Sequence, residues 1–177
     1  MAYRMFSRSL SIVAAGVILL LVASAQADKD ADKRTAGNSK LDDKTRMAAC
    51  NRLLAGDELS KTERAWALIR RGNFYRHMKK YDAALADFDQ AEKLDPDNPR
   101  LYRYRGWVYS DSKKNVEADT AFTKALKLDP RYAWSWYMRG RIRVRQKKYA
   151  DGMKDYDEAL ALNPRFSSAY SSRARLH

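Results

Sequence analysis

Apolar residues recur through most of the chain at intervals of three and four positions, as they do along one face of an α-helix. This spacing predicts a first helix over residues 41–55. Ser60 and Glu63 then form the sequence pattern of a capping box, so the next helix is expected to begin after Ser60. A pair of helices follows, over residues 65–78 and 82–94. The pattern therefore predicts an all-α fold.

Beyond residue 60 the sequence repeats itself every 34 residues. Three glycines and three prolines each stand 34 residues apart, and four further columns keep the same register. The columns are Gly72, Gly106 and Gly140; Pro96, Pro130 and Pro164; Ala91, Ala125 and Ala159; Phe88, Phe122 and Tyr156; Ala84, Ala118 and Gly152; and Leu68, Tyr102 and Trp136. Glycine and alanine let two helices approach closely, and proline ends a helix because it lacks an amide hydrogen. Each period therefore predicts one hairpin of two antiparallel helices.

These columns resemble the tetratricopeptide repeat, whose pattern matches Leu68, Gly72, Tyr75, Ala84, Phe88, Ala91 and Pro96 and their successors. The repeat domain is expected over residues 60–177. It comprises full repeats at 65–98, 99–132 and 133–166 and a partial repeat at 167–177. The resemblance implies a right-handed α-solenoid, in which each repeat buries its apolar face only against its neighbours. Segment 41–59, a helix and a loop, is the expected N-terminal cap.

The N-terminal segment has the features of a Sec-type signal peptide. Arg4 and Arg8 precede an uncharged run over residues 10–27, and Ala25-Gln26-Ala27 offers the small residues that a signal peptidase requires. Cleavage is expected after Ala27, which would release the remainder into the periplasm or the medium. The alternative is an uncleaved anchor that holds the domain outside the cytoplasmic membrane.

Residues 28–40 contain almost no large apolar side chains. Such a segment gains too little from burial to offset the entropy of ordering it. We expect a disordered linker between the signal peptide and the first helix.

Composition adds a strong positive charge and excludes several kinds of chemistry. The 177 residues include 35 basic and 22 acidic side chains, for a net charge of +13, and removal of Arg4 and Arg8 with the signal peptide leaves +11. Residues 99–150 hold 14 basic and 4 acidic residues, which is +10. A single cysteine and two histidines exclude an intramolecular disulfide and the common zinc sites. The sequence contains no motif of an active site, so no enzyme activity, metal or cofactor is predicted.

The first helix of each repeat should present one stripe of side chains to the concave side of the solenoid. The residues offset from the core stripe are Trp66, Asn73, Arg76, Arg100, Arg103, Trp107, Trp134, Tyr137 and Arg141. Arginine binds carboxylates through paired hydrogen bonds, and aromatic rings supply rigid apolar area. An acidic segment with hydrophobic residues would suit this groove. The alternative is that the tryptophans fill spaces between helices and the arginines are solvated surface.

The resemblance implies a non-catalytic scaffold or adaptor that holds a protein or peptide in the groove. Some family members clamp a terminal carboxylate with lysines, asparagines and an arginine. Only Asn73 matches here, and Ile69, Tyr104, Trp134 and Met138 occupy the other places, so that clamp is not predicted. The alternative function is a basic module that binds anionic membrane lipid or an acidic envelope polymer. Nucleic-acid binding is disfavoured because the chain is expected to be exported.

Overall fold

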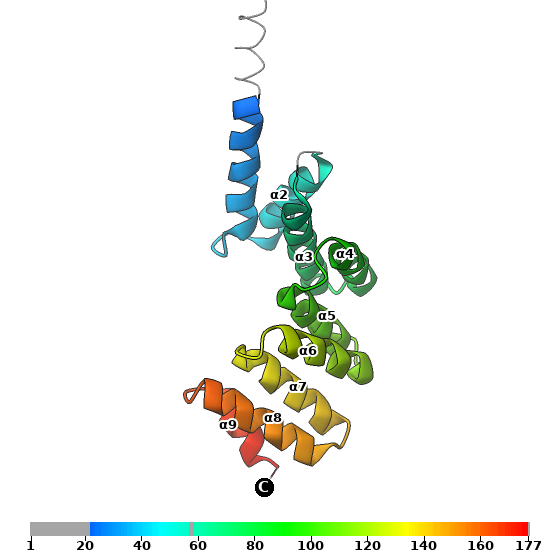
Figure 1. Cartoon of the computed structure of the whole chain (residues 1–177), viewed down its shortest axis with the longest axis vertical. Helices are drawn as coiled ribbons and strands as arrows, with labels where there is room; N and C mark the ends of the chain where they lie inside the picture. The colour runs from blue at the N-terminus through cyan, green and yellow to red at the C-terminus, as the bar shows by residue number, and fades with distance from the viewer. Residues whose placement is uncertain (1–21, 57–58, 177) are drawn as a thin grey trace, which may run out of the picture. The chain divides into compact units, whose positions relative to one another are not determined.

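The computed structural model describes residues 22–56 and 59–176 (Figure 1). They belong to two compact units, Met1–Asp57 and Glu58–His177. Residues 1–21 of the expected signal peptide lie outside the described residues. Among the helices that are described, none combines the length and the apolar character needed to cross a bilayer.

The N-terminal unit contains a helical segment over residues 22–37 and helix α2 (Asp43–Ala55). Asp42 caps α2, because its carboxylate accepts a hydrogen bond of 2.9 Å from the amide of Thr45. Arg52 of α2 donates to Asp32 of the preceding helical segment, with 3.0 Å between Nε and Oδ1. The ion pair joins the two helices of this unit.

This arrangement differs from the disordered linker expected over residues 28–40, because residues 28–37 are helical. Composition correctly indicates that the segment has little to bury. A contact that composition does not show compensates for this, since Asp32 binds an arginine 20 positions away, and Ala36 is fully buried. Side chains of Gln26 and Asp30, one helical turn apart, also bond at 3.1 Å.

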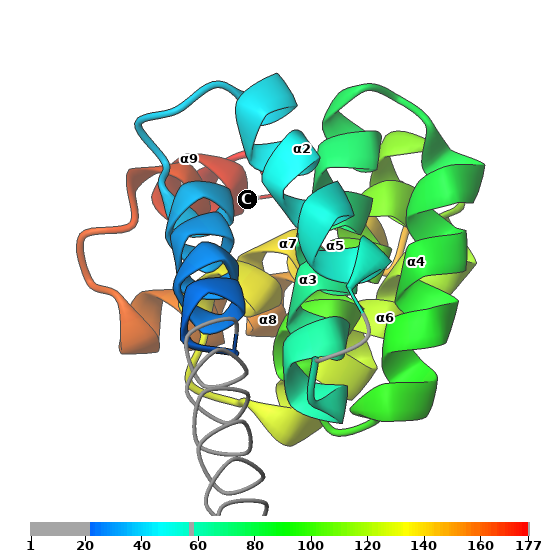
Figure 2. The same ribbon diagram turned by 90° about the horizontal axis from the view of Figure 1, so that it is seen from above.

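The C-terminal unit consists of helical hairpins that follow one another along the chain (Figure 1). Its helices are α3 (Lys61–His77), α4 (Tyr81–Leu94), α5 (Pro99–Asp111), α6 (Asn115–Leu128), α7 (Ala133–Arg145), α8 (Tyr149–Leu162) and α9 (Ser167–Ala174). In the view of Figure 2, α4 and α6 lie on the same side of α3 and α5. This is the stack of helical hairpins that the 34-residue period predicts, and α9 follows the third hairpin.

The capping box predicted before α3 is present. The amide of Ser60 donates to Glu63 Oε2 at 2.8 Å, and the amide of Glu63 donates to Ser60 Oγ at 3.3 Å. The two bonds satisfy amides that a helix start leaves without an internal acceptor. Helix α3 therefore begins directly after Ser60, as expected.

The glycine column sets the distance between the two helices of each hairpin. A Cβ added to Gly106 would lie 2.9 Å from ring atoms of Phe122, and one added to Gly140 would lie 2.8 Å from the ring of Tyr156. A Cβ added to Gly72 would clash with the ring of Phe88 in the same way. Each aromatic ring therefore occupies the space that a side chain on the glycine would need.

Arginine–aspartate pairs add a polar link to two of the three hairpins. The guanidinium of Arg71 donates two hydrogen bonds to the carboxylate of Asp87, at 2.7 and 2.8 Å. Arg139 donates two to Asp155 in the same way, at 2.7 and 3.0 Å. In each pair the two residues are 16 positions apart. The corresponding position of the middle repeat is Ala121, so this hairpin lacks the aspartate.

In the middle repeat Arg105 turns instead to the preceding hairpin. Its guanidinium lies 2.7 Å from Glu92 Oε2, and Tyr102 and Lys124 approach the other oxygen of Glu92 at 2.8 and 3.2 Å. Partial burial by itself raises the pKa of Glu92. The hydrogen bonds from these three side chains and the charge of Arg105 outweigh it and lower the pKa from 4.5 to about 2. Glu92 thus links two consecutive repeats through its ionised form.

Replacement of Gly106 by alanine is predicted to destabilise the protein by about 1–3 kcal/mol, because the added methyl group has no space beside Phe122. Alanine favours the helix over glycine by about 1 kcal/mol, so the same substitution at a site with free space would stabilise the protein. Urea unfolding followed by circular dichroism measures the change. Val116→Ala, at a position 70% exposed on α6, is the control and should change stability little. Equal or higher stability of Gly106→Ala would contradict the packing described.

Glu92→Gln is predicted to lower the melting temperature at neutral pH, because it removes the charge that holds Arg105 and Lys124. The folded-state pKa lies below the ordinary value, so the stabilisation is complete above about pH 4.5 and is lost as the pH falls towards 2. The difference between wild type and variant should therefore shrink over this range. Melting curves at pH 7, 4 and 2.5 measure it, with exposed Glu158→Gln as the control. A difference independent of pH would exclude the proposed role of the carboxylate.

Candidate functional site

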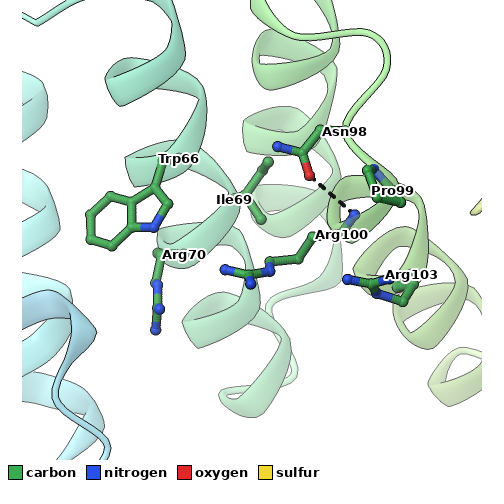
Figure 3. Close-up of a pocket in the computed structure, with 7 residues that line it drawn as sticks. All are labelled: Trp66, Ile69, Arg70, Asn98, Pro99, Arg100 and Arg103. Atoms are coloured by element: carbon green, nitrogen blue, oxygen red, sulfur yellow. Dashed lines mark hydrogen bonds between the residues drawn. The ribbon is translucent and has the colours of Figure 1, made fainter. Parts of the chain in front are cut away.

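Two pockets open between the first helices of consecutive repeats. One lies between α3 and α5 and has a volume of about 210 Å³; the other lies between α5 and α7 and has a volume of about 540 Å³. The first is lined by Trp66, Ile69, Arg70, Asn98, Pro99, Arg100 and Arg103 (Figure 3), and the second by Ser110, Asp111, Lys113, Asn115, Met138, Arg141 and Arg145. We call these two pockets and the surface of α5 between them the first-helix groove.

The first pocket places two predicted arginines at the start of α5. Asn98 caps this helix and accepts from the amide of Arg100 at 3.1 Å, while Pro99 occupies the first helical position. In Figure 3 the side chain of Arg100 extends from α5 towards α3. Among the described residues no carboxylate forms an ion pair with Arg100, which is exposed. Its guanidinium is available to a ligand.

Arg103 differs from Arg100, although both line the same pocket. Its Nη1 atom lies 2.9 Å from Asp129 Oδ2, and its guanidinium stacks 4.1 Å above the ring of Tyr132. Both partners come from the segment that leads into the next repeat. The charge of Arg103 is thus already matched inside the protein.

Three predicted residues meet in the middle of the groove. Arg76 lies 5.1 Å above the ring of Trp107 and donates to Asn73 at 3.2 Å and to Asp111 at 3.0 Å. Trp107 in turn meets the ring of Tyr104 edge-on at 5.1 Å. The cluster joins α3 to α5 and combines aromatic area with an arginine whose charge Asp111 balances.

The second pocket contains the other arginines without a carboxylate. Arg141 contacts the sulfur of Met138 at 3.8 Å, and its guanidinium lies 5.7 Å from the centre of the Tyr137 ring. Arg145 donates to Ser110 Oγ at 3.2 Å. Within residues 22–56 and 59–176, neither arginine pairs with an acidic side chain. Both can therefore accept a carboxylate from a ligand.

Tyr137 is a core residue, in contrast to its predicted place in the groove. It is only 7% exposed and packs on Phe166 and Tyr156, with ring centres 4.9 and 5.9 Å apart. Trp134, which is 39% exposed, stacks on the same Phe166 at 5.0 Å. Two repeats share this arrangement. Phe166, just before α9, packs on Tyr137, and Tyr132, 34 residues earlier and just before α7, packs on Arg103.

Trp66 lies at the edge of the first pocket, and the guanidinium of Arg70 stacks 5.0 Å above its ring.

The structure adds residues to the groove that were not predicted from the sequence: Arg145 and the aspartates that bind Arg76 and Arg103. Asp111 lies 35 positions from Arg76, and Asp129 lies 26 positions from Arg103. Such spacings carry no local signal, and only the 34-residue register brings these side chains within reach of each other.

Models of the tetratricopeptide repeat match residues 65–98, 99–132 and 133–166. The chain belongs to the tetratricopeptide repeat family. These are the three units that the period of 34 delimits, and the fold of such repeats is typically a non-catalytic protein-interaction module. Comparison with curated proteins gave no match.

Several solved tetratricopeptide repeat (TPR) structures are similar to this TPR chain. The first TPR of Spaghetti (RPAP3), bound to the HSP90 peptide SRMEEVD, is 28% identical, with a TM-score of 0.63 over 68% of this chain and 95% of that one. The second TPR domain of human RPAP3, in complex with the HSP70 peptide SGPTIEEVD, is 25% identical, with a TM-score of 0.63 over 66% and 97%. MamA, at 21% identity and a TM-score of 0.68 over 81% and 80%, shares the fold.

Alanine substitutions should separate the core residue from the groove residue. Tyr137→Ala is predicted to cost about 3–5 kcal/mol, because it leaves a cavity beneath Phe166. Arg141→Ala should change stability by less than about 0.5 kcal/mol, since Arg141 forms no ion pair within the described part of the chain. Urea unfolding measures both. Similar losses in the two variants would show that Arg141 is also structural.

Proposed function

We propose that this protein is an exported, non-catalytic TPR scaffold that binds an acidic segment of another protein in the first-helix groove. The observation that carries this proposal is the contrast among the groove arginines. Arg76 and Arg103 are paired with aspartates, whereas Arg100, Arg141 and Arg145 line the pockets without a carboxylate among the described residues. Three cations beside aromatic surface form a site for an acidic, partly apolar ligand.

The peptides bound by two similar TPR domains support an acidic ligand. Both peptides end in Glu-Glu-Val-Asp, so two neighbouring carboxylates and a valine precede the C-terminal aspartate. Repeats of this chain superpose on those domains over about two thirds of its length. We extend the preference for acidic peptides to this chain on the basis of its own arginines.

Export is the second part of the proposal, and it rests on residues 1–27. Two arginines, an apolar run and the small residues before Asp28 form the pattern of a Sec-type signal peptide. Cleavage after Ala27 would place the TPR unit in the periplasm or outside the cell. A partner is therefore expected among envelope or secreted proteins.

The alternative, adsorption of the basic segment 99–150 to anionic lipid or polymer, receives less support from the structure. Six of its 14 basic residues are engaged in internal ion pairs with carboxylates. These residues are Arg103, Arg105, Lys124, Arg139, Arg143 and Lys148. The excess positive charge of this segment is therefore smaller at the surface than in the sequence, which favours a local site in the groove.

Pull-down from a periplasmic extract tests the proposal. Arg100→Glu/Arg141→Glu should reduce recovery of the bound proteins by about tenfold or more, because each change removes a charge-assisted hydrogen bond and adds repulsion. Lys93→Glu/Lys127→Glu makes the same change in net charge at exposed positions near the ends of α4 and α6 and should bind like wild type. Circular dichroism confirms that both variants are folded. Equal recovery with the two variants would contradict binding in the groove.

A further inference from the structure

The two pockets of the first-helix groove lie near opposite ends of α5. Arg100 marks the first pocket and Ser110 the second, ten residues further along the same helix. A rise of 1.5 Å per residue separates them by about 15 Å. An extended polypeptide advances about 3.3 Å per residue, so the same distance corresponds to four or five residues of ligand.

Each pocket offers cations that the protein leaves without an internal carboxylate. The first has Arg100, since Arg103 is held by Asp129. The second has Arg141 and Arg145 on α7 and Lys113 in the turn after α5, and Asp111, the acidic residue that lines it, is held by Arg76. Favourable places for a ligand carboxylate are thus found at both ends of the groove.

The surface between the pockets has a different character. Tyr104 and Trp107 lie three residues apart on α5, between Arg100 and Ser110, and their rings are in contact. Positions 100, 104, 107 and 111 share one face of a helix. The charge of Arg76 above Trp107 is balanced by Asp111. A side chain of the ligand that meets this middle section finds aromatic surface and no unmatched charge.

We infer that the groove reads an internal, extended segment with two acidic residues four or five positions apart and an apolar residue between them. This inference rests on the proposed function and specifies its ligand. Recognition occurs through side-chain carboxylates at two separate pockets. A free C-terminus is not required, because the apolar side chains of Ile69 in the first pocket and Met138 in the second are part of the lining.

Two fluorescein-labelled peptides of equal composition and charge test the spacing. Both carry a C-terminal amide: Ser-Glu-Ser-Leu-Ser-Ser-Glu-Ser separates the glutamates by four residues, and Ser-Ser-Glu-Leu-Glu-Ser-Ser-Ser by one. Fluorescence anisotropy with the full chain should show about tenfold or tighter binding of the first peptide, because only this peptide reaches both pockets. The preference should disappear in Arg100→Gln and in Arg141→Gln/Arg145→Gln. It should persist in Lys127→Gln, the control at an exposed position of α6.

Equal affinity of wild type for the two peptides, or absence of binding at millimolar concentration, would overturn the inference. A preference that persists in Arg100→Gln would do the same. So would binding that becomes tenfold tighter when the amide is replaced by a free carboxylate, since this would indicate recognition of a chain end. The pull-down with Arg100→Glu/Arg141→Glu judges the proposed function independently, because it depends on no assumed spacing.

Discussion

Close contact between a glycine and an aromatic ring recurs in every hairpin of the repeat unit, and the arrangement of the other elements depends on it. Gly72 faces Phe88, Gly106 faces Phe122 and Gly140 faces Tyr156. A helix pair held at this short distance exposes its first helix at the same place in each repeat, so α3, α5 and α7 form one continuous surface. The first-helix groove is a consequence of that regularity.

Arginine has two separate roles on this scaffold. Arg71 and Arg139 bind aspartates within their own hairpins, and Arg105 and Arg103 bind carboxylates of neighbouring segments. These pairs are bidentate or backed by aromatic rings, which favours arginine over lysine at such sites. Arg100, Arg141 and Arg145, by contrast, line the groove without an acidic partner among the described residues. Net charge alone does not separate the two groups, because only the distribution of aspartates decides which cations are available to a ligand.

Much of the fold follows from sequence because its determinants are periodic or local. The glycine, aromatic and proline columns depend on a fixed period of 34, and the Ser60–Glu63 capping box spans four residues, so each can be recognised without coordinates. The groove could be predicted only in outline. Helical spacing places Arg100 and Arg141 on the right helices, but it does not show that Phe166 covers Tyr137. Residues 28–37 form a helix for a comparable reason, since Asp32 meets Arg52 across a turn. Both outcomes depend on tertiary contacts that a helical pattern does not encode.

A crystal structure of the protein with a partner captured from the cell envelope tests the central claim most directly, because it shows which surface the partner occupies. We predict that an extended segment crosses α3, α5 and α7, with one carboxylate at Arg100 and another at Arg141 or Arg145. A partner bound to α4, α6 and α8, away from both pockets of the groove, would contradict the account.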